Sequence, residues 1–351
     1  MTRTVLVCEA QVPFVTGGAE YFSAELVRQL RVHGYEAERV SVPFKWYPKA
    51  ELFTQAAAWR LLDLAESSGR PVDLVITTKF PTYCVRHPNK VAWLLHQYRA
   101  AYELAGTAFS EFEHVEEDVA VRDRLVALDT AMLAECRRLY AISRTSADRV
   151  TRFNGLDVGV VYHPPRLATR LHAGQERDGY ILSIGRLEAI KRVNLAVRAL
   201  AQTPGDLELV VAGTGSRRDE LEALAASLGV GGRVRFLGSV TDEQVIELYA
   251  GALAVVFPPY EEDYGYVTLE AFLAHTPVIT TTDAGGPNEF VVDGENGFVC
   301  EPDPAALGEA MARLHADRAR AAAMGDVGFE RASLVTWTGV IDRLVGAADA
   351  A

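Results

Sequence analysis

The sequence lacks any apolar run that approaches the roughly 20 residues needed to span a membrane. Its start, Met1-Thr2-Arg3-Thr4 followed directly by a strand pattern, has none of the long apolar region of a signal peptide. Cysteine is scarce, and the four cysteines, Cys8, Cys84, Cys136 and Cys300, show no paired spacing. We therefore expect reduced thiols in a cytoplasmic protein, not disulfides, a zinc site or a transmembrane helix.

An excess of basic residues is also missing, because the formal net charge is -12, with 35 Lys and Arg against 47 Asp and Glu. Residues 1–165 hold 19 basic and 20 acidic residues, whereas residues 166–351 hold 16 and 27. Without a basic stripe, a nucleic-acid partner is not expected. The near-neutral first part leaves room for a peripheral contact with the inner membrane face but does not predict one.

What is present is an ordinary globular composition, 49% hydrophobic and 23% charged over 351 residues, which is enough for two domains with their own cores. Short apolar strands alternate with helical patterns, and the alternation restarts after His163-Pro164-Pro165. This predicts an α/β fold with two Rossmann-like, doubly wound parallel-sheet domains that face a cleft. The predicted helices include Glu20–Val32, Leu52–Glu66, Glu111–Arg138, Ser143–Phe153 and one that begins at Lys191.

The stretch from Phe257 to Ala271 combines features that suit a ligand. Two prolines end a short apolar run, and Glu262 then precedes a helix predicted to begin near Val267. Glu270 lies inside that helix, with seven residues between the two carboxylates. A carboxylate beside the unpaired N–H groups of a helix N-terminus suits a ligand that carries both hydroxyls and phosphates.

Two loops between a predicted strand and a predicted helix could hold phosphate. Gly17 and Gly18 could let backbone N–H groups approach a phosphate, or could serve only the tight connection. Gly185 and Arg186 follow another strand, and Lys191 begins the next helix, so both bases could reach one anion, although surface bases are usually solvated.

Two further features carry weaker signals. Gly213-Thr214-Gly215 lacks the third glycine of a dinucleotide fingerprint, because Arg218 stands in its place, and this disfavours an NAD-dependent oxidoreductase. His96 follows an apolar strand directly, at the edge where open parallel sheets bind ligands, although a lone histidine is more often structural.

Four motifs in order resemble those of the retaining glycosyltransferases of family four, which have the GT-B fold. Glu262 to Glu270 is similar to the E-x7-E signature, and Gly185-Arg186-Leu187 with Lys191-Arg192 is similar to G-R-L-x-x-x-K-[RG]. Gly17-Gly18-Ala19-Glu20 resembles the N-terminal glycine loop. The late segment Gly285-Gly286-Pro287 to Phe298 resembles G-G-x-x-E followed by D-G-x-x-G. The resemblance covers essentially the whole chain. The final segment, Phe329–Val345, resembles the C-terminal helix that crosses back onto the first domain in this fold.

The resemblance implies a role for each matching residue. Arg186 and Lys191 would neutralise the diphosphate of a sugar nucleotide, Glu270 would accept hydrogen bonds from the ribose, and Glu262 would contact a donor-sugar hydroxyl. His96 would touch the donor sugar from the acceptor side, but Gln97 stands where the family often has aspartate. The other residues assigned to the donor are Gly17, Gly18, Gly185, Gly213, Tyr264, Gly265, Tyr266 and Val267.

The implied reaction is front-face substitution with retention, in which the leaving diphosphate takes the acceptor proton and no protein nucleophile is needed. Glu262 and Glu270 are therefore not interpreted as the carboxylate pair of a glycosidase. No cofactor and no metal are expected. Glu261, Glu262 and Asp263 could be imagined as a magnesium site, but the two bases already supply positive charge. The expected domains are residues 1–165 with about 335–351, and about 175–334.

Two alternatives to sugar transfer stay open: a sugar-nucleotide epimerase of the same architecture, and a non-catalytic protein that binds sugar nucleotides. The Glu-Glu-Asp-Tyr-Gly sequence at 261–265 leans towards GDP-mannose, with UDP-hexoses nearly as well supported. The acceptor could be a glycan, a lipid carrier or a small molecule. Aromatic residues in Pro43–Pro48 and His96–Tyr102 could stack on it or simply cover the core.

Overall fold

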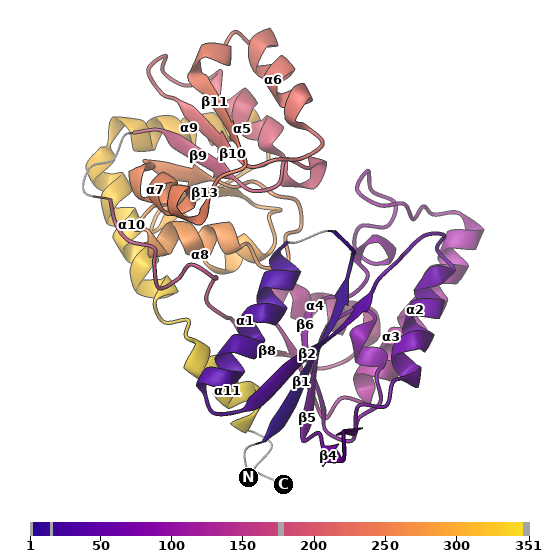
Figure 1. Cartoon of the computed structure of the whole chain (residues 1–351). Coiled ribbons are helices and arrows are strands. Elements are labelled where there is room, and N and C mark those ends of the chain that lie inside the picture. The colour runs from indigo at the N-terminus through magenta and orange to yellow at the C-terminus, as the bar shows by residue number, and fades with distance from the viewer. Residues whose placement is uncertain (1–2, 15–16, 175–178, 347–351) are drawn as a thin grey trace. The chain divides into compact units, whose positions relative to one another are not determined.

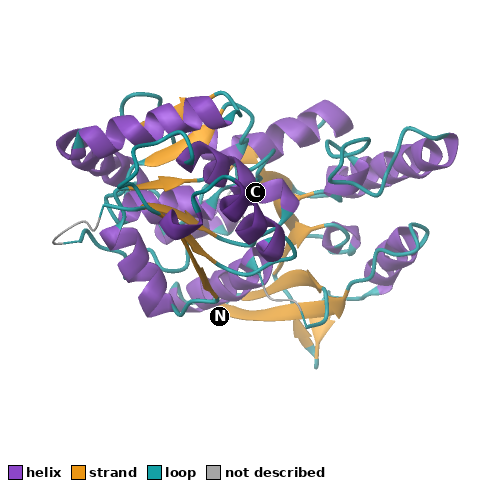
Figure 2. Ribbon diagram, turned by 90° about the horizontal axis from the view of Figure 1, so that it is seen from above, coloured by secondary structure: helices purple, strands orange, loops and turns teal. Residues whose placement is uncertain are grey.

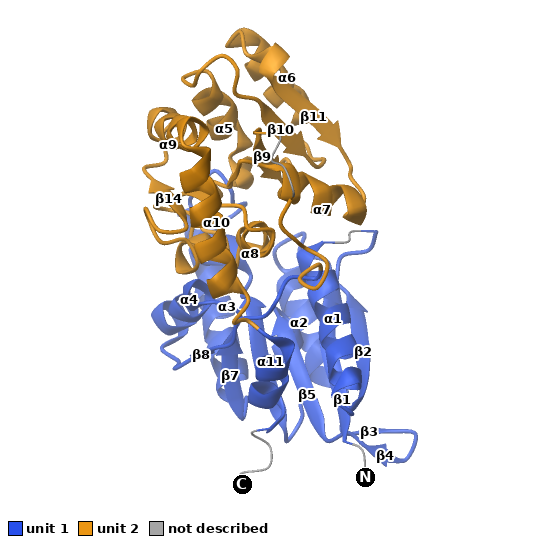
Figure 3. Ribbon diagram, turned by 90° about the vertical axis from the view of Figure 1, so that its left-hand side faces the viewer, with its two compact units in different colours: residues 1–166, 336–351 blue, residues 167–335 orange. Residues whose placement is uncertain are grey.

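The computed structural model of the chain describes residues 3–14, 17–174 and 179–346. The chain divides into two compact units (Figure 3). Unit 1 holds Met1–Arg166 and Thr336–Ala351, and unit 2 holds Leu167–Val335. The chain thus passes from unit 1 into unit 2 and returns, so that helix α11 (Trp337–Leu344) belongs to the unit that the N-terminal residues form.

Unit 1 is built around a six-stranded sheet in which every neighbouring pair is parallel. The strand order is β2-β1-β5-β6-β7-β8. The strands are β1 (Thr4–Gln11), β2 (Glu36–Pro43), β5 (Leu74–Lys79), β6 (Lys90–His96), β7 (Arg138–Ala141) and β8 (Gly159–Val160). Strands β5 and β6 are buried along nearly their whole length. This explains why each contains an apolar run, Leu74–Ile76 in β5 and Val91–Leu95 in β6, that does not alternate with polar residues.

Helices cover both faces of this sheet (Figure 1). Helices α2 (Glu51–Leu61) and α3 (Glu116–Ala134) lie on one face, and α1 (Gly18–Val32) and α11 lie on the other. Helix α4 (Arg144–Asn154) begins as predicted, because the Ser143 hydroxyl accepts a hydrogen bond from the Ser146 N–H at 3.0 Å.

Two predicted helices of unit 1 were too long. Helix α2 ends at Leu61, and Glu66 instead belongs to a two-stranded ribbon of β3 (Glu66–Ser67) and β4 (Arg70–Pro71). Its turn has positive φ at both Ser68 and Gly69, as a tight hairpin requires. Helix α3 begins only at Glu116, because the Asp118 carboxylate binds the Glu113 N–H at 2.7 Å and closes the preceding loop.

Unit 2 also has a six-stranded parallel sheet, but in the order β11-β10-β9-β12-β13-β14. The strands are β9 (Ile181–Ile184), β10 (Leu209–Ala212), β11 (Val234–Gly238), β12 (Ala254–Val256), β13 (Val278–Thr281) and β14 (Gly297–Cys300). The helices are α5 (Val193–Leu200), α6 (Arg218–Ser227), α7 (Asp242–Gly251), α8 (Tyr266–Leu273), α9 (Pro304–Ala316) and α10 (Arg318–Ala332). Each unit places its strands between helices (Figure 2), so the predicted fold class of two doubly wound α/β sheets is confirmed.

Three expectations in the second half were wrong. The helix predicted from Lys191 begins at Val193, because Arg192 has a left-handed φ of 51° and separates a short 3-10 turn, Ala189–Lys191, from α5. Strand β14 was not predicted. The final segment 329–345 is not one helix: α10 ends at Ala332, and the Thr336 hydroxyl caps a new helix, α11.

Candidate functional site

The middle of the unit 2 sheet brings two of the predicted motifs to one edge. Strands β9 and β12 are parallel neighbours, and the strand order reverses between them. Their carboxyl ends therefore lie side by side, where open α/β sheets hold ligands. Gly185 and Arg186 follow β9, and the loop from Phe257 to Glu262 follows β12.

Glycine is required where the loops after β9 and β10 cross. Gly213 has a φ of 126°, and a Cβ there would lie 1.9 Å from the Gly185 carbonyl oxygen. Gly185 has a φ of 138°, and its N–H donates to the Ala212 carbonyl at 3.0 Å. The predicted pair Gly185 and Gly213 is thus brought into direct contact.

Three basic side chains near this edge have different surroundings. Arg186 is exposed, and its guanidinium makes no hydrogen bond or ion pair within the described residues. Lys191 donates its Nζ proton to Glu262 Oε2, and both side chains are largely buried. The structure therefore places a predicted phosphate-binding base directly against a predicted sugar-binding carboxylate.

The guanidinium of Arg192, the residue after Lys191, is hydrogen-bonded to several groups of the protein. Its guanidinium donates to both Asp283 oxygens, at 2.8 and 2.5 Å, and to the Thr281 hydroxyl at 2.9 Å. It also donates to the carbonyls of Pro258 and Pro259, at 2.8 and 2.7 Å. Arg192 thus fixes the loop after β12 to the end of β13.

The backbone around Glu262 is held as firmly as its side chain. The Glu262 N–H donates to the Ala284 carbonyl at 2.8 Å, and the Glu262 carbonyl accepts from the Gly286 N–H at 2.7 Å. A Cβ at Gly285 or Gly286 would lie within 2.8 Å of backbone atoms of this loop. The close approach explains why two glycines follow Ala284 in the sequence.

Helix α8 presents the second carboxylate. Gly265, with a φ of 80°, caps the helix in a left-handed conformation, and a Cβ there would collide with the Pro287 ring. Tyr266 begins the helix, Val267 follows it, and the ring of Tyr264 packs edge-on against Tyr266 with centroids 5.2 Å apart. The first turn of such a helix leaves N–H groups without intrahelical acceptors.

Glu270 is positioned by a residue that the sequence did not reveal. The buried Tyr249 of α7 donates its hydroxyl to Glu270 Oε2 at 2.8 Å. Burial, together with the Glu270 charge, raises the pKa of Tyr249, so the phenol remains a donor. Burial and the charges of Glu270 and Glu262 likewise raise the pKa of Tyr266. A lone tyrosine on an ordinary amphipathic helix gave no signal for this role.

The remaining predicted residues lie in unit 1. His96 ends β6, and its Nδ1 lies 2.6 Å from the Gln97 carbonyl oxygen. Gly17 precedes α1, Gly18 is its exposed first residue, and the Gly17 N–H donates to Glu20 Oε2 at 2.8 Å. Lys79, at the end of β5, lies 3.6 Å from the other Glu20 oxygen. In this structure the glycine loop therefore holds a carboxylate of the protein itself.

The two aromatic segments of unit 1 come together at the same edge of its sheet. Phe44, after β2, lies 6.3 Å from Tyr98, after β6, and 6.1 Å from Phe80, after β5, between ring centroids. Trp46 stacks on Phe44, whereas Tyr47 is 59% exposed. The inner rings cover the core, and the outer ones remain accessible.

Two kinds of feature are absent from the described residues. Outside the gaps at 15–16 and 175–178 and the termini, no group of three or more His, Cys, Asp or Glu side chains is arranged to hold a metal ion. No helix in that same part of the chain has the length and apolar character needed to cross a membrane.

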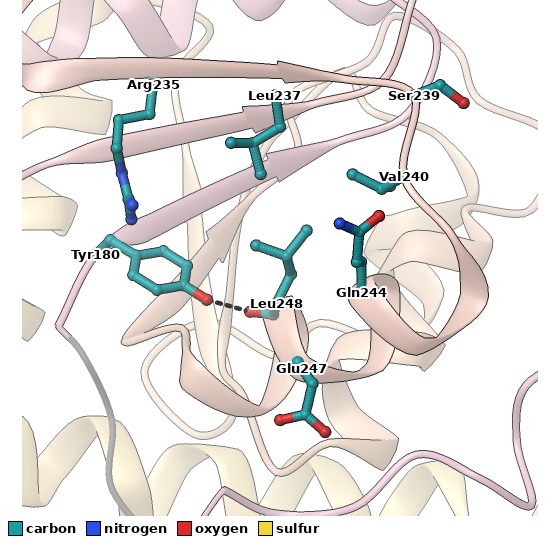
Figure 4. A pocket seen from close by; sticks show the side chains of 8 residues that line it. All are labelled: Tyr180, Arg235, Leu237, Ser239, Val240, Gln244, Glu247 and Leu248. Atoms are coloured by element: carbon teal, nitrogen blue, oxygen red, sulfur yellow. Dashed lines mark hydrogen bonds between the residues drawn. The ribbon is translucent and has the colours of Figure 1, made fainter.

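A hollow of about 370 Å³ lies elsewhere in unit 2 (Figure 4). Its walls come from β11, the loop after it and α7, and Tyr180 donates to the Leu248 carbonyl at 2.8 Å. Tyr180 precedes β9, so the hollow reaches the opposite end of that strand from Gly185. None of the predicted site residues lines it.

Comparison with known proteins finds similarity to one enzyme family over part of the chain. Residues 170–331 match the model of the glycosyl transferases group 1. The D-inositol 3-phosphate glycosyltransferase of Mycobacteroides abscessus is 32% identical over 222 residues, 60% of this chain and 48% of that protein. The matching segment, nearly the whole of unit 2, resembles the group 1 glycosyl transferases. The human alpha-1,3/1,6-mannosyltransferase ALG2 is 35% identical over 167 residues, 43% of this chain and 40% of that protein. The chain spans about half the length of the curated relatives it matches.

Solved structures of low sequence identity share the fold of this chain. Sucrose-phosphate synthase from Thermosynechococcus elongatus matches with a TM-score of 0.80 at 19% identity, over 99% of this chain and all of that one. Anabaena HepE in complex with UDP and glucose matches with a TM-score of 0.72 at 17% identity, over 99% and 100%. The predicted GT-B fold and family resemblance are therefore confirmed.

Proposed function

We propose that the chain transfers a hexosyl group from a nucleoside-diphosphate sugar to a hydroxyl acceptor with retention of anomeric configuration. The observation that carries this proposal is the contact between a base, Lys191, and a carboxylate, Glu262, at the reversal point of the unit 2 sheet. Arg186 and Lys191 follow β9, and Glu262 and Glu270 follow β12. A diphosphate suits the bases, and sugar and ribose hydroxyls suit the carboxylates.

Each side chain then has one task. Arg186, exposed and without a protein partner among the described residues, offers its guanidinium to the diphosphate. Lys191 supplies a second positive charge. Glu270, oriented by the Tyr249 hydroxyl at 2.8 Å, accepts from the ribose hydroxyls, and Glu262 accepts from a hydroxyl of the transferred sugar.

In the chemical step, the bond between the anomeric carbon and the diphosphate oxygen breaks. The acceptor oxygen forms its bond to the same face of that carbon, and its proton passes to the departing diphosphate oxygen. Negative charge grows on the diphosphate as the bond breaks, so the fixed charges of Arg186 and Lys191 stabilise the transition state more than the ground state. This charge is available without a metal ion, and we infer a metal-independent reaction.

The proposal also concerns which nucleotide sugar is the donor and where the acceptor binds. One relative is named for mannosyl transfer and one matching structure contains UDP and glucose, so both GDP-mannose and UDP-hexoses remain donors to test. For the acceptor we favour the edge of unit 1 that carries His96, Trp46 and Tyr47, because the exposed Tyr47 ring and the partly buried Trp46 ring can stack on a sugar or a lipid carrier.

The test is thermal-shift binding of GDP, UDP, ADP and dTDP with EDTA present. A ligand at 100 times its Kd should stabilise the folded state by about 2.7 kcal/mol. Arg186→Ala should lose most of the shift, whereas Arg198→Ala, which removes another exposed arginine of the same unit, should keep it. Folded wild-type protein that responds to none of the four nucleotides would contradict the proposal. Binding without transfer to any acceptor would favour a sugar-nucleotide sensor, and sugar-nucleotide conversion without an acceptor would favour an epimerase.

A further inference from the structure

We propose that the ion pair between Lys191 and Glu262 makes the site discriminate between an intact nucleoside-diphosphate sugar and the nucleoside diphosphate that remains after transfer. The inference rests on the proposed function, because it assigns the two residues to opposite sides of the bond that breaks. It adds a property that neither residue would have alone: selective rejection of the product.

The pair is a fixed feature of unit 2 and not a chance surface contact. The side chains of Lys191 and Glu262 are only 16% and 20% exposed. The Lys191 N–H donates to the Glu188 carbonyl at 2.9 Å, and the Glu262 backbone is bonded on both sides to the segment that follows β13. Because neither backbone is loose, the contact depends on side-chain rotation alone.

A diphosphate that binds Lys191 must therefore displace Glu262 from its partner. An intact sugar nucleotide compensates for this displacement, since the sugar presents hydroxyl donors to the carboxylate while the phosphates take the lysine. A free nucleoside diphosphate has no sugar hydroxyls at that position and presents a terminal phosphate of higher negative charge. Glu262 is then left beside a like charge in a largely buried place, which is unfavourable.

The neighbouring pair of Arg192 and Asp283 does not have this property. The Arg192 guanidinium donates five hydrogen bonds to the protein. A ligand could bind it only by breaking the hydrogen bonds that hold the loop after β12. Lys191 makes its side-chain hydrogen bond to Glu262 alone among the described residues. The exchangeable base is thus Lys191, and Glu262 controls its availability.

Glu262→Gln tests the proposal, because it removes the charge while it keeps the shape. The dissociation constants of UDP and UDP-glucose, and of GDP and GDP-mannose, are measured by calorimetry at constant ionic strength without acceptor. We expect the variant to bind the nucleoside diphosphate about tenfold more tightly, and to bind the sugar nucleotide no more tightly than wild type does. The preference for the sugar nucleotide should fall by at least tenfold.

Glu188→Gln is the matched control, because it removes one negative charge from the loop after β9. Glu188 is bonded to the Ser216 hydroxyl at 2.7 Å and not to a lysine. An equal gain in nucleoside-diphosphate binding in both variants would assign the effect to net charge and overturn the proposal. An unchanged preference in Glu262→Gln would overturn it as well. Wild-type protein that binds neither ligand would instead refute the proposed function, so the two failures are distinguishable.

Discussion

Replacing Arg192 tests whether this basic residue of the site stabilises the fold. Its guanidinium joins the carbonyls of Pro258 and Pro259 to Asp283, and its side chain is 15% exposed. Arg192→Ala would leave a partly buried carboxylate without its cation and two carbonyls without donors. Breaking such a pair costs about 3 kcal/mol or more. That loss is a large fraction of the stability of a domain.

The distribution of tryptophan provides the assay. All four tryptophans, at positions 46, 59, 93 and 337, belong to unit 1. Tryptophan fluorescence in urea therefore reports on unit 1, whereas far-UV circular dichroism reports on both units. We expect Arg192→Ala to leave the urea midpoint of the fluorescence transition near that of wild type. The part of the circular dichroism transition that fluorescence does not follow, which belongs to unit 2, should move to lower urea.

Arg186→Ala serves as the reference variant, because its exposed side chain has no partner within the described residues. It should change stability by no more than about 0.5 kcal/mol, although it should abolish nucleotide binding. If Arg192→Ala proved as stable as Arg186→Ala by circular dichroism, the structural role derived for Arg192 would be wrong.

The same pair predicts a pH dependence with a definite sign. Burial pushes the pKa of Asp283 upwards, but the hydrogen bonds from Arg192 and Thr281 outweigh it and hold that pKa below its ordinary value of 3.8. The ionised pair therefore stabilises the protein above that value, and its contribution is lost as the pH falls through the lowered pKa. The stability difference between wild type and Arg192→Ala should narrow in that acidic range.

Three further predictions concern other parts of the chain. Burial raises the pKa of Asp129 to about 7, so unit 1 should lose stability as the pH rises from about 4 to 7, by up to about 1.4 kcal/mol per pH unit. Asp129→Asn should flatten this slope in urea unfolding followed by tryptophan fluorescence. Gly213→Ala should destabilise unit 2 by about 3 kcal/mol or more, whereas Gly205→Ala, where a Cβ meets nothing within 4 Å, should be tolerated in the same circular dichroism assay. Transfer activity should be unchanged in EDTA. A complete loss of activity that Mg²⁺ restores would contradict the proposal of a metal-independent reaction.

The sequence predicted the sheets well because their strands are buried on both faces. Leu209–Ala212 is apolar throughout, and β5 begins with the buried apolar residues Leu74–Ile76. Few other structures accommodate such runs between glycine and proline. Helix ends were predicted less well, since they depend on single side chains. The carboxylate of Asp118 closes the loop before α3, and the paired positive φ values of Ser68 and Gly69 start a ribbon after α2.

The sequence shows where the candidate site residues lie along the chain, but not which side chains they contact. The spacing of Glu262 and Glu270 is visible in the sequence, whereas the hydrogen bond from Tyr249 to Glu270 depends on how α7 packs against α8. The ion pair of Lys191 and Glu262 joins residues 71 positions apart, and only the adjacency of β9 and β12 brings them together. Contacts of this kind follow from the order of strands, which a linear pattern does not encode.

Lys191 and Arg192 are adjacent and carry the same charge, but the backbone conformation between them directs their side chains to different partners. Lys191 ends a 3-10 turn, and the left-handed φ of 51° at Arg192 turns the chain before α5 begins. Consecutive residues on either side of such a break point in different directions, so one base reaches Glu262 and the other reaches Asp283. Exchanging the two, as Lys191→Arg with Arg192→Lys, should therefore fail at both places. A lysine cannot replace the bidentate contact with Asp283, and the bulkier arginine would hold Glu262 at two points and release it less readily to a ligand.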